Sequence, residues 1–166
     1  MSLIELEAER HTNPVDVIEH VAALEDWTFE RSGDDEITVS IKGRWCDYHV
    51  SFSWMEDVEA LHLACAFDLK VTEARRAEVM RLLTLVNEQM WLGHFDLWSG
   101  EGVVMYRHAH LLVGGAEPSA RQVDAMLTSA IDSCDRYYQA FQFVVWAGKS
   151  AQEALEGALF ETMGRA

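Results

Sequence analysis

The residues best suited to chemistry lie within one stretch of twenty, GHFDLWSGEGVVMYRHAHLL, at positions 93–112. This stretch contains three histidines, an aspartate and an arginine, which are side chains that bind metals or transfer protons. It also contains a turn bracketed by glycines, SGEG at 99–102, between two segments in which apolar and polar residues alternate. Two interpretations are open: a metal or catalytic site, or a β-hairpin that carries polar side chains.

The alternation predicts a hairpin that pairs residues 94–98 with residues 103–110. In this register position 98 lies opposite 103, position 96 opposite 105, and position 94 opposite 107. His94, Asp96 and Trp98 then share one face of the sheet with Val103, Met105 and Arg107. Phe95, Leu97, Val104, Tyr106, His108 and His110 share the other face.

The predicted hairpin separates the histidines. A zinc ion needs three or four ligands at about 2 Å, but His94 lies on the opposite face from His108 and His110. A shift of one residue would bring the three together and would also turn the apolar side chains outward. We therefore expect no metal ligands here. We expect Asp96 and Arg107, which become diagonal neighbours, to form an ion pair.

Sequence motifs for other chemistry are missing. The chain has no GxSxG nucleophile elbow, no phosphate-binding glycine loop, no HExxH motif and no helical ExxH pair. The GDDE at 33–36 lacks the spacing of a calcium loop and is typical of a solvated turn. We predict no catalytic residues, no cofactor and no enzymatic activity. An acid–base pair of scattered carboxylates stays open as an alternative.

The elements that must position these residues follow from periodicity. Helices are predicted from Pro14 with Asn13 as N-cap, from Thr72, from Pro118 and Ser119 with a capping box to Gln122, and from Ser150 after Gly148. Strict alternation predicts strands in 36–42, 45–54 and 60–69, and a short leading strand within 27–35 is an open alternative.

This order predicts an α+β fold in a single domain. It has a mostly antiparallel sheet of about five strands with helices on one face, in the order α-β-β-β-α-β-β-α-α. We expect the domain to span residues 13–166, after a flexible N-terminal segment at residues 1–12.

Composition excludes several classes of partner. Acidic residues outnumber basic ones 28 to 13, which disfavours nucleic acids and anionic membranes as partners. The three cysteines, Cys46, Cys65 and Cys134, have no CxxC spacing and are interpreted as small apolar residues. The first residues are acidic where a secretory signal would be basic, so we expect a cytoplasmic protein.

Two groups of side chains are candidates for binding. The first is the polar face of the predicted sheet, which is either a partner-binding surface or is covered by a tail, the first helix or a second subunit. Its members are Trp45, His49, His62, His94, Trp98, Met105 and Arg107. The second group lies off the apolar stripe of the third helix and is a candidate dimer or docking surface: Tyr137, Phe143 and Trp146.

Three segments resemble one known family. They are NEQMWLGHFDLW, then VVMYRH after a glycine turn, and CDRYYQAFQFVVWAGKSAQEAL near the end, with Gly93, Phe95, Tyr106 and Arg107 carrying much of the likeness. The sequence is similar to YbjN-type proteins, which are regarded as bacterial sensory-transduction regulators, over about residues 13–160. The resemblance implies an α-β-β-β-α-β-β-α fold like that of class I type III secretion chaperones, which are small, acidic, dimeric and bind extended segments of partner chains. It brings no catalytic residues, and the fourth predicted helix departs from the chaperone pattern.

These inferences together predict a non-enzymatic regulatory or chaperone-like module that binds an unidentified protein partner and forms a homodimer. The alternative is a small-molecule-sensing regulatory domain with a pocket between sheet and helices. A cryptic hydrolase or metal enzyme is the third hypothesis.

Overall fold

The sheet at the centre of the fold has six strands in the order β1-β2-β3-β4-β6-β5, with every neighbouring pair antiparallel. The computed structural model describes residues 10–163 and the side chains of residues 10–160. The elements in chain order are α1 (Pro14–Leu24), β1 (Thr28–Arg31), β2 (Glu36–Lys42), β3 (Asp47–Met55), β4 (Ala60–Lys70), α2 (Arg76–Asn87), β5 (His94–Trp98), β6 (Val103–Leu111), α3 (Ala120–Val145) and α4 (Ala151–Met163). Single turns of 3₁₀ helix occupy Glu56–Val58 and Glu73–Arg75.

The predicted α+β class is confirmed, with one strand more than the five expected. The additional strand is β1, which pairs with residues 37–40 in the middle of β2. The second predicted helix also begins later than Thr72, because residues 73–75 form a 3₁₀ turn before α2 starts at Arg76. The prediction of a flexible segment at residues 1–12 lies largely outside the described residues.

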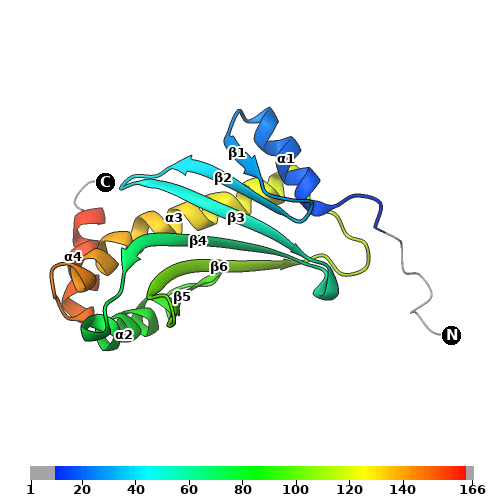
Figure 1. Ribbon diagram of the computed structural model, residues 1–166. Helices are drawn as coiled ribbons and strands as arrows, with labels where there is room; N and C mark the ends of the chain where they lie inside the picture. Colours follow the sequence, from blue (N-terminus) through cyan, green and yellow to red (C-terminus); the bar gives the residue numbers. More distant parts are fainter. Residues whose placement is uncertain (1–9, 164–166) are drawn as a thin grey trace.

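Alternation decides which face of the sheet is buried. One cross-strand row consists of Val39, Val50, Cys65, Tyr106 and Phe95, and each of these side chains is at most 1% exposed. The residues between them along each strand point to the other face and are mostly small, polar or charged, with apolar exceptions that include Met105 and Trp98. The helices pack on the buried face, with α3 running along it as in Figure 1.

The helix ends follow the predicted caps. The Asn13 side chain accepts a hydrogen bond from the Val15 N–H at 2.9 Å, with Pro14 in the first turn of α1. Ser119 and Gln122 form the predicted capping box at the start of α3. The Ser150 hydroxyl accepts from the Glu153 N–H at 3.3 Å beside the start of α4. Each cap satisfies main-chain donors that the first helical turn leaves without partners.

Aromatic rings join α3 to the sheet. The Phe67 ring of β4 lies 5.0 Å from Tyr138 in an edge-to-face arrangement, and Phe95 of β5 lies 5.4 Å from Phe141. Such pairs add stabilisation beyond the area they bury. Two of the cysteines, Cys65 and Cys134, are fully buried in this core as free thiols.

The N-terminal end of the described chain is anchored at the far end of the sheet. The Arg10 guanidinium donates to the carbonyls of Leu112 and Ala116 and stacks 4.5 Å from the Trp54 ring. Within residues 10–163, none of the helices combines the length and apolar character needed to cross a membrane.

Candidate functional site

Among residues 10–163, one face of the sheet carries no packed helix; this face is the candidate site, and we call it the open face. Its central cross-strand row is Thr38, Ser51, Ala64, Arg107 and His94, one residue from each of five strands. The hydroxyl groups of Thr38 and Ser51 form a hydrogen bond of 3.0 Å between β2 and β3. Small side chains here leave a broad surface on which Arg107 is the largest group of the row.

Six of the seven residues predicted for this surface lie on the open face. They are His49, His62, His94, Trp98, Met105 and Arg107. Trp98 is 46% exposed, whereas Met105 is only 7% exposed because Asp96 and the neighbouring strands flank it. His49 accepts or donates a hydrogen bond with the Ser40 hydroxyl at 2.9 Å.

Trp45 is the exception, and its predicted position was wrong. The alternation over residues 45–54 suggested a strand position facing outward, but β3 begins only at Asp47. Trp45 lies in the β2–β3 loop and packs on the helical side, where its indole N–H donates to the Asp135 carbonyl of α3 at 2.8 Å. The Asp135 carboxylate also accepts from the Arg44 N–H at 2.8 Å and from the Tyr48 hydroxyl at 2.9 Å. This loop is therefore fastened to α3.

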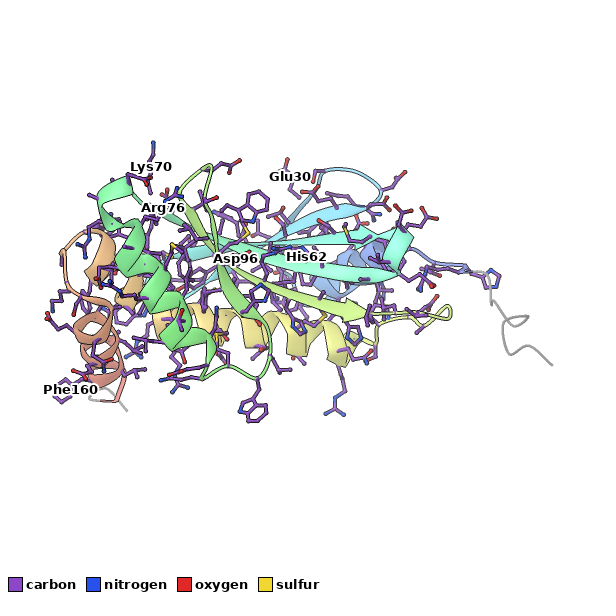
Figure 2. The ribbon with its side chains drawn as sticks, turned by 90° about the horizontal axis from the view of Figure 1, so that it is seen from below. Glu30, His62, Lys70, Arg76, Asp96 and Phe160 are labelled. Carbon is purple, nitrogen blue, oxygen red and sulfur yellow. The ribbon has the colours of Figure 1, made fainter. Side chains whose placement is uncertain are left out.

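Arg107 connects three strands of the open face. Its Nη1 lies 3.2 Å from the Asp96 carboxylate on β5, and its Nε donates to Nε2 of His62 on β4, also at 3.2 Å. The predicted Asp96–Arg107 ion pair is thus confirmed. Burial lowers the pKa of His62, and the positive charge of Arg107 lowers it further. The lowered pKa favours the neutral imidazole, whose Nε2 accepts the hydrogen bond from the Arg107 Nε–H. Figure 2 labels His62 and Asp96 near the middle of the sheet.

The hairpin register is as predicted. His94 pairs with Arg107, Asp96 with Met105, and Trp98 with Val103. His108 and His110 pair with Leu63 and Leu61, whose side chains are fully buried on the helical face, so His94 lies on the other side of the sheet. In the part of the chain that the structure describes, no three His, Cys, Asp or Glu side chains converge on a position for a metal ion.

The second predicted surface is largely covered by the chain itself, which corrects the prediction. Tyr137 is 3% exposed, because its ring packs 5.9 Å from Phe95 and its hydroxyl donates to Gln89 at 3.2 Å. Phe143 lies beneath α4, close to Gly157, and the Lys149 ammonium lies 4.6 Å from its ring. Only Trp146 is well exposed, at 63%. Spacing on α3 alone could not reveal that α2, β5 and α4 would cover the first two.

Asn87 is a residue that the sequence analysis missed. It ends α2, and its side-chain amide pairs with the outer edge of β5: Nδ2 donates to the Phe95 carbonyl and Oδ1 accepts from the Phe95 N–H, both at 2.9 Å. The Asp96 carboxylate accepts from the Leu97 N–H at 2.9 Å. The edge of β5 therefore has few free main-chain groups to offer a further strand. An asparagine at the end of a helix was the available signal.

Two surface pockets lie beside the helical layer. One is lined by Glu78, Arg81, Thr84, Leu85 and residues 150–152 between α2 and α4. Another lies where β2 approaches α3, among Trp27, Ile41, Leu127 and Ile131. Both are open hollows, and the second lies between the sheet and α3, which is where the small-molecule-sensing alternative expects a pocket.

The fold is shared with a solved structure of low sequence identity. YbjN from E. coli aligns with a TM-score of 0.54 and 7% identity over 89% of this chain and 93% of that one. A chain from the crystal structure of the ExsC–ExsE complex aligns with a TM-score of 0.42 and 16% identity, over 66% of this chain and 77% of that one. No curated protein sequence matches the chain.

A family model gives the assignment. The YbjN model, described as "Putative bacterial sensory transduction regulator", matches residues 14–143, which run from the first residue of α1 to the last turns of α3. That span contains every strand of the sheet and every residue of the open face. The chain therefore belongs to the YbjN family.

Proposed function

We propose that this protein is a non-enzymatic regulatory or chaperone-like module that binds a protein partner on its open face and acts in the cytoplasm as a homodimer. The observation that carries the proposal is a six-stranded sheet on which the helices of the described part of the chain pack against one face alone. Antiparallel sheets tolerate a solvated face, but this one carries Trp98, Met105 and Arg107, residue types that are enriched in interfaces.

Membership of the YbjN family supports a regulatory role, since the family is described in terms of sensory transduction. The net charge of −15 supports a partner with a basic surface, because charge complementarity speeds association and excludes other acidic proteins. At the centre of the face the Asp96 carboxylate offsets the charge of Arg107, so this pair adds no net charge there, whereas the chain as a whole carries −15.

Site-specific photo-crosslinking tests the binding face. Ala66 is exposed on the open face, and Ala125 is exposed on the outer side of α3, so each accepts a benzophenone side chain without disturbing the core. In the native cell, the side chain at position 66 should crosslink to one protein other than this chain. The yield of that crosslink should fall when Trp98→Ala or Arg107→Ala is added. Crosslinks from position 125 alone, or recovery unchanged by either substitution, would contradict it.

The homodimer is supported by apolar side chains exposed on the helical layer. Trp91 is 98% exposed, Trp146 63% and Phe160 77%, and Figure 2 shows Phe160 standing out from α4. A second copy would remove this area from water. Light scattering over micromolar concentrations tests the proposal: a dimer that Trp91→Ser or Trp146→Ser weakens is expected, and a strict monomer excludes it.

A further inference from the structure

The two edges of the sheet differ. At β5, the Asn87 side chain occupies both main-chain groups of Phe95, and the Asp96 carboxylate accepts from the Leu97 N–H. At β1, the Ser32 N–H donates inward to the Glu36 carbonyl at 3.1 Å. Because the direction of main-chain groups alternates along a strand, Phe29 and Arg31 direct their N–H and C=O groups outward. Among the described residues, no hydrogen bond uses these outward groups.

The free edge has a defined beginning. The Trp27 N–H, which has the same parity, already donates to the Ala22 carbonyl of α1 at 2.9 Å. The open row of donors and acceptors therefore starts at Phe29 and ends where Ser32 turns toward β2. β1 is four residues long, and the outward N–H and C=O groups of Phe29 and Arg31 can pair with a short extended segment.

The residues around this edge are mostly acidic and therefore favour a basic partner. Residues 21–41 contain six acidic residues and one basic residue, Arg31. The Arg31 guanidinium is already held by Asp16 and Glu19, each at 2.6 Å, so it does not neutralise the others. Glu30 is exposed on the open-face side of β1, where Figure 2 places it away from α3. A second copy of this chain would bring a second acidic edge against the first.

An apolar pocket lies on the opposite side of the same edge. Trp27 and Ile41 line it from the strands, Leu127 and Ile131 line it from α3, and Asp124 and Asp132 stand at its rim. Its volume of about 230 Å³ exceeds the ~150 Å³ cavity that accepts benzene in an engineered protein core, so a branched aliphatic side chain fits. When a peptide adds to a sheet as a further strand, main-chain hydrogen bonds supply affinity. Pockets beside the strand then select every second side chain of the peptide.

We propose that the outer edge of β1 binds an extended segment of a partner protein in which basic residues alternate with apolar ones, adding it to the sheet as a seventh strand. The basic side chains face Glu30 and its acidic neighbours, and the apolar ones face Phe29 and the pocket at Trp27. This surface is distinct from the open face, so the two proposals fail separately.

The probe is a seven-residue peptide of alternating lysine and valine, with glutamate in place of lysine as its control. Titration with the lysine peptide should slow amide exchange at Phe29 and Arg31, and the glutamate peptide should leave it unchanged. Two further peptides carry N-methyl groups on the valines only or on the lysines only. Since just one set of N–H groups can face β1, one methylated peptide should lose binding and the other should keep it.

Glu30→Lys is the protein variant, with Glu56→Lys as its matched control. Both residues are exposed and both changes shift the net charge equally, but Glu56 lies in the turn after β3, which is two strands away from β1 in the sheet. Glu30→Lys should weaken the lysine peptide roughly fivefold relative to Glu56→Lys. Equal binding of both methylated peptides, or exchange protection confined to the open face, would overturn the proposal. So would protection of Phe29 and Arg31 that rises with protein concentration alone, because a second copy would then occupy the edge.

Discussion

The side chain of Asn87 pairs with the main chain of Phe95 as a neighbouring strand would, donating to its carbonyl and accepting from its N–H at 2.9 Å in each case. The contact joins the end of α2 to the edge of the sheet across eight residues of chain. It also protects that edge, because a main-chain N–H and C=O that are already bonded cannot recruit another strand.

Asn87→Ala should lower the free energy of unfolding by about 1–3 kcal/mol, since two hydrogen bonds are lost and each contributes about 0.5–1.5 kcal/mol net. Urea denaturation measures the loss, and the Phe95 amide should exchange faster. Thr84→Ala, one turn earlier on the exposed side of α2, is the control and should change stability little. Equal stability of the two variants would mean that the pairing contributes nothing.

Gly93→Ala should be among the most damaging substitutions in the chain. Gly93 has φ +69°, and a Cβ atom there would lie 2.3 Å from the Tyr106 hydroxyl, whose ring is fully buried. Left-handed strain and overpacking each cost on the order of 1–3 kcal/mol, so thermal denaturation should show a clear fall. Gly100→Ala in the same hairpin meets nothing within 4 Å and should leave the melting temperature close to that of the wild type.

Stability should fall as the pH drops below about 6.5. Burial lowers the pKa values of His62 and His108, so both bind protons more readily in the unfolded chain. Their contribution to stability is complete above the unfolded pKa of about 6.5 and is lost as the pH falls toward the folded pKa. His62→Gln, which keeps an acceptor for Arg107, should flatten the dependence between pH 7.5 and 5.5. The control His20→Gln, on the exposed side of α1, should not; a slope that His62→Gln leaves intact would exclude His62 as its source.

The Arg107–Asp96 ion pair should contribute little to stability. The two side chains are 34% and 42% exposed and are 3.2 Å apart, so solvent screens their attraction. A double-mutant cycle with Arg107→Met and Asp96→Asn should give a coupling energy below about 1 kcal/mol that shrinks further in high salt. A larger coupling would show that the pair is a structural link between β5 and β6, and that Arg107 is less free to meet a partner.

Local sequence patterns predicted most of the secondary structure because their causes are local. Alternation in 36–42 and 60–69 marks strands with one buried face, and Asn13 and Ser119 cap helices through hydrogen bonds to residues two or three positions away. The hairpin register around residues 99–102 is equally local, since turn length and the apolar face define it together. Trp45 was misplaced because the alternation continues past the end of the strand into the loop.

The sequence by itself determined that this chain forms an α+β domain, which side chains share a face of each strand, and that His94 lies on the opposite face from His108 and His110. Only the tertiary structure decided that Tyr137 is buried, that Asn87 closes the edge of β5 and that the edge of β1 stays open. The physical reason is that side-chain direction follows from the local backbone, whereas cover for a surface comes from separate elements, which are eight residues apart for Asn87 and Phe95 and 48 residues apart for Tyr137 and Gln89. No local sequence pattern shows which of those elements will pack over a given surface.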